Sequence, residues 1–226
     1  MNITRTHKFF DTLLLALLVL SGGGLLFVYF KKPASAALCI LSLFVCMFFG
    51  GKLKKGLFNA GIFTFFTFSS IILFTYFASP FPQELIKYGF YLLNGLTCIL
   101  IYIHISNNRD LTYFYDRIRF VLRLILYISL ANFIFGILVG YGALKGLPWL
   151  KGEYHEVQHF NYLFFYVAEK HKYTVFGIDF VRNQGWFWEP GVNQVYLNIL
   201  LYLEGFVYKR RARWTIPLIV FAIIST

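Results

Sequence analysis

The sequence predicts an all-α, polytopic membrane protein, and two observations predict it. Of the 226 residues, 58% are hydrophobic and only 14% are charged, whereas a soluble domain carries about 25% charged residues. The apolar residues also form continuous runs, and a helix crosses the hydrocarbon layer with ~20 such residues. A membrane barrel would instead alternate apolar and polar residues in ~10-residue segments. These features exclude a soluble enzyme, a disordered chain and a coiled coil.

Six runs are long enough to span the membrane, and a seventh begins near the end of the chain. The six predicted spans are 10–30, 33–49, 57–78, 85–105, 120–142 and 192–208. The seventh starts at Trp214 and is still apolar at Thr226. Because no charged residue closes this last run, we expect the chain to be an N-terminal piece of a longer protein.

The connection between the first two spans is predicted at Lys31 and Lys32, with Pro33 in the first turn of the second helix. The first span is not a cleaved signal peptide, because its apolar region is longer than the ~7–15 residues of a signal core. The three glycines at 22–24 leave two interpretations open. They either break the helix, as in many transporters, or permit close packing between helices.

The basic residues indicate how the chain is oriented. Most of them fall at alternate ends of the spans: Arg5, Lys8, Lys52, Lys54, Lys55, Arg109, Arg117, Arg119, Arg123, Lys209, Arg210, Arg211 and Arg213. Because Lys and Arg concentrate in cytoplasmic loops, this alternation predicts a cytoplasmic N-terminus. The formal net charge of +11 therefore orients a membrane protein and does not indicate nucleic-acid binding.

The predicted organisation is one membrane domain interrupted by one large loop. Residues 1–142 hold five spans, residues 143–191 form an extracytoplasmic loop, and residues 192–226 hold the last two spans. Long loops are uncommon unless they are functional. The middle of this loop, 154–170, has few helix breakers and many aromatic residues. We predict that it forms an amphipathic helix on the membrane surface.

Where the loop re-enters the membrane, several features coincide. Pro190 suits the first turn of the sixth helix, which places Glu189 at or near its N-cap. Gly185 and Gly191 permit either a close approach of the backbone or unusual backbone dihedral angles. Trp188 is of the type found at the headgroup level. Each feature also has a purely structural interpretation, in which Glu189 only caps the helix.

Two amide side chains follow on the sixth span. Gln194 and Asn198 are four residues apart, so they share one face of an otherwise apolar helix. At that depth we expect them to face the protein interior or a wet cavity. Together with Arg182 and Glu189 they would place a cation, an acid and two amides at one membrane surface. Such a site suits a lipid-linked anionic substrate, although Arg182 could simply pair with a lipid phosphate.

This segment resembles the O-antigen polymerase and ligase superfamily, in particular its oligosaccharide repeat-unit polymerases. The residues that carry the resemblance are Arg182, Gly185, Phe187, Trp188, Glu189, Pro190, Gly191, Gln194, Leu197 and Asn198. The resemblance implies a glycosyltransferase in the bacterial cytoplasmic (inner) membrane that joins repeat units carried on undecaprenyl diphosphate. It implies no cofactor or metal, and it suggests a chain-length regulator and a flippase as partners. Members of the family usually have ten or more spans, so this chain is expected to carry part of the site.

The resemblance also implies roles for single residues. Arg182 would contact the diphosphate leaving group, since guanidinium binds phosphate in a bidentate manner. Glu189 would accept the proton of the attacking hydroxyl, with His155, His159 and His171 as second choices. The residues expected to bind substrate are Gln194, Asn198, Trp188, His155 and His159.

Two other functions remain open at this point. The sequence His155-Glu156-Val157-Gln158-His159 fits the H-E-x-x-H pattern, in which two histidines on a helix bind zinc and the glutamate activates water. That interpretation predicts a membrane metallopeptidase and needs a third ligand, for which Glu169 and His171 lie close in the sequence. The other function is that of a non-catalytic component of a polysaccharide transporter.

Overall fold

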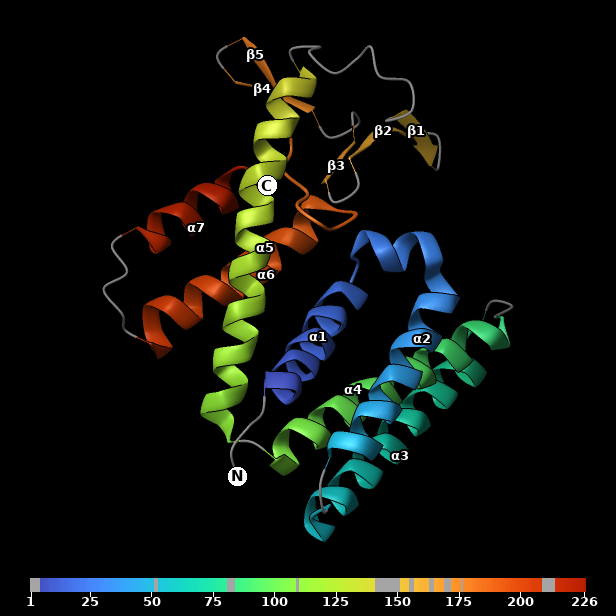
Figure 1. Ribbon diagram of the computed structural model, residues 1–226. Coiled ribbons are helices and arrows are strands. Elements are labelled where there is room, and N and C mark those ends of the chain that lie inside the picture. The colour runs from blue at the N-terminus through green and yellow to red at the C-terminus, as the bar shows by residue number, and fades with distance from the viewer. Residues whose placement is uncertain are drawn as a thin grey trace. The chain divides into compact units, whose positions relative to one another are not determined.

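The computed structural model describes residues 5–50, 53–80, 84–108, 110–140, 151–154, 157–162, 165–168, 172–175, 177–208 and 214–226. The helices are α1 (Arg5–Ser21), α2 (Leu25–Phe49), α3 (Lys55–Ala78), α4 (Leu85–Asn108), α5 (Leu111–Gly140), α6 (Pro190–Tyr202), the π-helical turn η2 (Leu203–Val207) and α7 (Thr215–Ile224) (Figure 1). The chain divides into two compact units. The first unit is Met1–Ser21 with Leu26–Ile118, and the second unit is Gly22–Leu25 with Arg119–Thr226.

Four helical segments are long and apolar enough to cross a membrane. Among the described residues they are Lys32–Phe49, Lys55–Ala78, Leu85–Asn107 and Leu111–Leu138. The predicted helical membrane protein is therefore supported, but the count of six to seven spans is not confirmed. α1 has 17 residues, α6 has 13 and continues into the five residues of η2, and α7 has 10. At ~1.5 Å per residue these three are shorter than the ~30 Å hydrocarbon layer.

The side chains of α3 and α4 fit a lipid environment. Large hydrophobic side chains of α3 point outward, and Phe74 and Phe77 are more than 70% exposed. The two helices pack against each other in the first unit (Figure 1). At Gly61 and Gly95 an added Cβ would collide with side chains of the opposite helix. Small residues of this kind allow membrane helices to approach closely.

The first predicted span is broken, and the break settles the open question about 22–24. α1 ends at Ser21 and α2 starts at Leu25, with Gly23 at a φ of 122°. Side-chain-bearing residues avoid that region, so consecutive glycines are the natural place for the interruption.

The predicted connection at Lys31 and Lys32 is wrong, because α2 continues through Pro33. A proline inside a helix removes one hydrogen bond and bends the axis without ending an apolar helix. Figure 1 shows α2 changing direction along its length.

The loop between α5 and α6 contains short strands. β1 (Lys151–Tyr154), β2 (Val157–Tyr162) and β3 (Phe165–Ala168) form an antiparallel sheet, and β4 (Lys172–Val175) pairs with β5 (Ile178–Val181). The amphipathic helix predicted over 154–170 is therefore wrong. The aromatic and β-branched residues in this segment favour extended backbone, and pairing with neighbouring strands satisfies the main chain there.

α5 and α6 run antiparallel in the second unit, and each buries one stripe of residues. On α6 and η2 the buried positions follow helical spacing: Pro190, Asn193, Leu197, Leu200, Leu203 and Glu204. Ser129 of α5 lies beside Asn193, and Arg119 lies beside Glu204. The fifth helix starts at Leu111, nine residues before the predicted Phe120, so Arg117 and Arg119 lie within the helix together with Arg123.

Candidate functional site

The segment that carries the predicted site, residues 182–198, begins where β5 meets α5. Val181 is buried and lies against Gly136, where an added Cβ would be 3.6 Å from the Val181 carbonyl oxygen. The next residues then enter the core, since Asn183 and Gln184 are buried. The main-chain N–H of Asn183 donates to the carbonyl oxygen of Ser225, at 2.9 Å. This contact ties the start of the segment to the end of α7.

Asn183 is the centre of a buried group of uncharged polar side chains, which we call the neutral cluster. Its members are Ser129, Asn132, Asn183, Asn193 and Ser225. Asn183 Nδ2 donates to the hydroxyl oxygens of Ser129 at 2.8 Å and Ser225 at 2.9 Å. Asn193 Nδ2 donates to the same Ser129 oxygen at 2.8 Å, and Asn132 Nδ2 donates to Asn183 Oδ1 at 3.4 Å. Buried polar groups require such partners, so the cluster fixes the segment against α5, α6 and α7.

Gly185 makes the turn that follows. Its φ is +58°, which is an unusual dihedral angle of the kind that the sequence allowed. Its N–H donates to Asn183 Oδ1 at 3.1 Å. A Cβ at this position would also lie 2.8 Å from Asn193 Oδ1. Both the backbone angle and the space therefore require glycine. Gly191 differs, because it lies in α6 and a Cβ there would meet nothing within 4 Å.

The helix break at 22–24 belongs to this same site. The N–H of Leu25 donates to the carbonyl of Trp186 at 3.0 Å, and the N–H of Trp188 donates to the carbonyl of Gly23 at 2.9 Å. Gly24 and Phe187 thus form an antiparallel bridge. Phe187 is fully buried and stacks on Tyr196 with ring centroids 5.0 Å apart. The segment around Phe187 is consequently held by the backbone of residues 23–25 on one side and by Tyr196 of α6 on the other.

Glu189 occupies the N-cap of α6, and Pro190 is at the first helical position, as predicted. Its carbonyl accepts the N–H of Val192 at 3.2 Å. Its side chain, however, makes no capping hydrogen bond, and the residue is exposed. The interpretation of Glu189 as a simple capping residue is therefore not supported. The carboxylate stands at the N-terminal end of α6, the positive end of the helix dipole.

Arg182 is exposed and forms one hydrogen bond, from Nε to the main-chain oxygen of Thr226 at 2.6 Å. Within the described part of the chain, its two terminal NH2 groups make no hydrogen bond and it forms no ion pair with Glu189. Trp188 is half-buried, and its carbonyl accepts a hydrogen bond from Gln184 Nε2 at 2.6 Å. The residue that precedes Glu189 is thus anchored through its main chain.

The predicted positions of Gln194 and Asn198 need correction. Gln194 is half-buried, Asn198 is exposed, and Asn198 Nδ2 donates to the Gln194 carbonyl of the same helix at 3.0 Å. The amide that enters the interior is Asn193, which is fully buried. The two predicted residues do share a helix, but the face that packs on α5 begins one residue earlier. A sequence signal existed in Ser129 and Asn132, three residues apart within an apolar helix.

The one described histidine of the loop pattern His155-Glu156-x-x-His159 is His159, and it does not lie on a helix. His159 lies in β2, where its Cα pairs with Gly152 and Ala168, so the helical spacing that the metallopeptidase pattern needs is absent. His155 and His171, and with them Glu156 and Glu169, lie outside the described residues. No group of three or more metal-ligating side chains occurs among the residues that the structure describes.

The first unit holds a polar cluster that sequence reasoning missed. Asp11 of α1 and His104 of α4 are buried, with Oδ1 and Nε2 2.8 Å apart. The hydroxyl of Tyr113 donates to Asp11 Oδ2 at 2.8 Å. Asp11 lies in the second turn of α1 and is only 1% exposed, so its carboxylate is inside the unit. The arrangement joins α1, α4 and the start of α5, so the cluster has a structural role.

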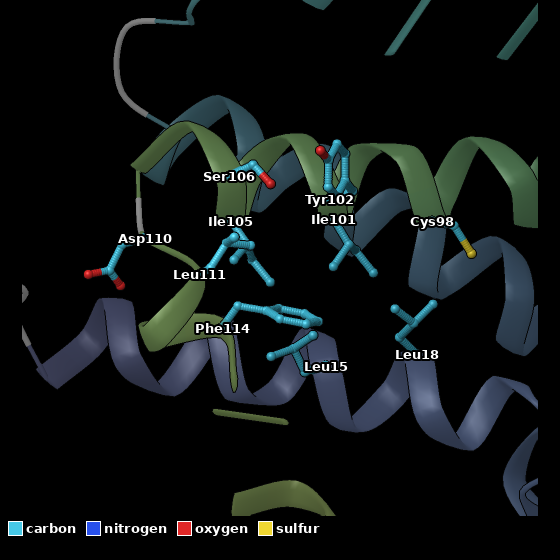
Figure 2. Close-up of a pocket in the computed structure, with 10 residues that line it drawn as sticks. All are labelled: Leu15, Leu18, Cys98, Ile101, Tyr102, Ile105, Ser106, Asp110, Leu111 and Phe114. Carbon is cyan, nitrogen blue, oxygen red and sulfur yellow. The ribbon is translucent and has the colours of Figure 1, made fainter. Parts of the chain in front are cut away.

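A cavity of about 580 Å³ lies in the same unit. It is lined by Leu15, Leu18, Cys98, Ile101, Tyr102, Ile105, Ser106, Asp110, Leu111 and Phe114. Figure 2 shows Asp110 at one end of this set, turned away from the central apolar side chains. Asp110 Oδ1 accepts the N–H of Tyr113 at 2.7 Å, which makes it the N-cap of α5. The cavity therefore offers an apolar space without a group of catalytic side chains.

Comparison with protein-family models, with curated proteins and with solved structures finds no match to this chain.

Proposed function

We propose that the chain is a membrane glycosyltransferase of the O-antigen polymerase and ligase type. It would polymerise or transfer oligosaccharide repeat units carried on undecaprenyl diphosphate, at the outer face of the bacterial cytoplasmic membrane, with no cofactor. The observation that carries the proposal is Glu189: an exposed carboxylate at the α6 N-cap whose side chain does not cap the helix. An acid that gives its own helix no side-chain hydrogen bond is available for a substrate.

The surroundings of Glu189 support a positioned acid. Trp188 and Gly185 are fixed by main-chain hydrogen bonds, so the backbone beside the carboxylate is pre-organised. A base that must accept a proton at a defined point benefits from such rigidity. Arg182 lies in the same segment and keeps both terminal NH2 groups available, the fork that binds phosphate oxygens.

The reaction would proceed as a displacement at the anomeric carbon. A hydroxyl oxygen of one repeat unit attacks that carbon on another, its proton passes to Glu189, and the bond to the diphosphate oxygen breaks. Arg182 offsets the negative charge that develops on the departing polyprenyl diphosphate. Trp188 is proposed to contact a sugar face, and Gln194 and Asn198 are proposed to bind sugar hydroxyls from α6. A chain-length regulator and a flippase are the proposed partners.

The test replaces Glu189 with Gln in the full-length protein and displays the cell's surface polysaccharide on a gel. We expect the ladder of long chains to collapse to single repeat units, because loss of a general base typically costs about 10²–10⁴-fold in rate. Protein level in the membrane is measured in parallel, and it should not change, since Glu189 makes no capping hydrogen bond.

Glu84 offers a matched control. It also precedes a helix, its carbonyl accepts the N–H of Lys87 at 3.0 Å, and it is exposed. Glu84→Gln should leave the ladder intact. A ladder that survives Glu189→Gln would refute the proposed role of this acid and would favour the transporter-component interpretation.

A further inference from the structure

A further polar group of the second unit, which we call the charged cluster, lies where α5 meets η2. Its members are Arg119 and Arg123 of α5 and Glu204 of η2, and Glu204 is 0% exposed. Arg119 donates from Nε to Glu204 Oε1 at 2.7 Å and from Nη2 to Oε2 at 2.8 Å. Arg123 donates from Nε to the same Oε1 at 2.7 Å. Two guanidinium groups thus converge on one carboxylate.

The charges of this cluster do not balance. The bidentate contact with Arg119 already neutralises Glu204, and it is the strong form of such pairs. Arg119 also lies over the ring of Tyr208, 4.3 Å from its centroid. Arg123 adds a second positive charge, which gives these three side chains a formal charge of +1. The arrangement contains more positive charge than its own carboxylate can compensate.

Arg123 has hydrogen-bond donors that its contact with Glu204 does not use. Its side chain is 32% exposed, and among the described residues its only hydrogen bond or ion pair is the one from Nε to Glu204. Glu204 therefore fixes the base of the guanidinium while both terminal NH2 groups remain unused. This fork geometry matches two oxygens of a phosphate group.

The location makes an anion the expected partner. Arg123 lies within Leu111–Leu138, a candidate membrane span, about 18 Å along the helix from Leu111. A charged side chain in an apolar span is costly and is usually paired or functional. A π-helical turn such as η2 is also frequent at functional sites.

We propose that the charged cluster is a binding site for a phosphate group, which Arg123 contacts through its terminal NH2 groups while Glu204 and Arg119 hold it in place. The phosphate can belong to an anionic lipid headgroup or to a soluble phosphate compound. This site is independent of the proposed glycosyltransferase site, because it lies at the other end of the α5–α6 pair. Either site can fail its test without affecting the other.

The experiment measures thermal unfolding of the purified chain in lipid nanodiscs. In the first arm, nanodiscs of phosphatidylcholine receive inorganic diphosphate. In the second arm, phosphatidylglycerol replaces part of the phosphatidylcholine and no diphosphate is added. A ligand at a hundredfold excess over its Kd should raise Tm by about 5–10 °C. The arm that shows the rise identifies the source of the phosphate.

Arg123→Gln removes the surplus charge but keeps the Arg119–Glu204 pair, so we expect it to fold and to lose the rise in Tm. Lys55→Gln is the charge-matched control, because Lys55 is exposed at the start of α3, and it should keep the rise. Arg123→Lys retains the charge without the fork and should keep less than half of the rise.

Three results would overturn the proposal: no rise in either arm for the unchanged protein, an undiminished rise in Arg123→Gln, or equal loss in Lys55→Gln. If Arg123→Gln does not fold, the Arg123→Lys variant tests the proposal instead. A full rise in Tm in that variant refutes binding through the guanidinium fork.

Discussion

The two ends of the α5–α6 pair bury polar side chains in opposite ways. At one end the neutral cluster joins hydroxyls and amides, with Ser129 Oγ accepting from both Asn183 and Asn193. At the other end the charged cluster brings two arginines to Glu204. Both lie on the same buried stripes, separated by leucines such as Leu126 and Leu200.

The difference between the two clusters indicates a different role for each end of the α5–α6 pair. Neutral hydrogen bonds are short-ranged and directional, so the neutral cluster fixes the backbone of the segment that holds Glu189. The charged cluster carries surplus charge that its own residues leave uncompensated, which suits an end that receives an external anion. Rigidity is thus associated with the neutral end, and binding with the charged end.

The largest effect is expected from Glu204→Gln. The change leaves Arg119 and Arg123 beside a neutral amide, and breaking a buried ion pair in this way costs about 3–5 kcal/mol. Chemical unfolding in detergent measures the loss. In an Arg123→Gln background the loss should be clearly smaller, since fewer stranded charges remain. Equal losses in the two backgrounds would show that Arg123 does not share the charge of Glu204.

Gly185→Ala tests the neutral end through its backbone. The φ of +58° and the 2.8 Å approach to Asn193 Oδ1 should together cost about 2–3 kcal/mol. The glycan ladder should shorten as well, because the segment that carries Glu189 shifts. Gly191→Ala is the matched control and should change the free energy of unfolding by less than about 0.5 kcal/mol. Similar values for the two variants would mean that the turn at Gly185 is not under constraint.

The smallest effect is expected from Asn193→Ala. The change removes the donor to Ser129 Oγ and should cost about 1–2 kcal/mol. Asn198→Ala, on an exposed face of the same helix, should cost less than about 0.5 kcal/mol. Thermal unfolding of the two variants side by side measures the contrast. A larger loss of stability in Asn198→Ala than in Asn193→Ala would indicate that the face carrying Asn198 is the buried one, as the sequence predicted.

Local features of the site were predictable from the sequence. Pro190 sets the start of α6 and hence the N-cap at Glu189, because proline is favoured at the first helical position. The unusual angle at Gly185 follows from the same kind of short-range rule. The helical, apolar character of the four candidate spans also follows from composition alone.

Features that depend on partners far along the chain were not predictable. Which amide of α6 is buried depends on the rotation of that helix against α5, so Asn198 was chosen and Asn193 was missed. Arg119 was assigned to a basic loop because the fifth span was started at Phe120. Arg123 falls inside that predicted span, but its pairing with Glu204 depends on a residue 81 positions later in the chain. The strands of the loop were missed because short aromatic segments carry no clear period, and strand pairing decided their conformation.

The bridge between Gly24 and Phe187 has a consequence for the order of synthesis. The ribosome releases Gly23 and Leu25 long before Trp186 and Trp188, so the two sides of this bridge meet only after helices α1 to α5 have been made. The segment that carries Glu189 is therefore a late product of folding. It also cannot be moved to another protein as one continuous peptide, because part of its backbone pairing comes from the opposite end of the chain.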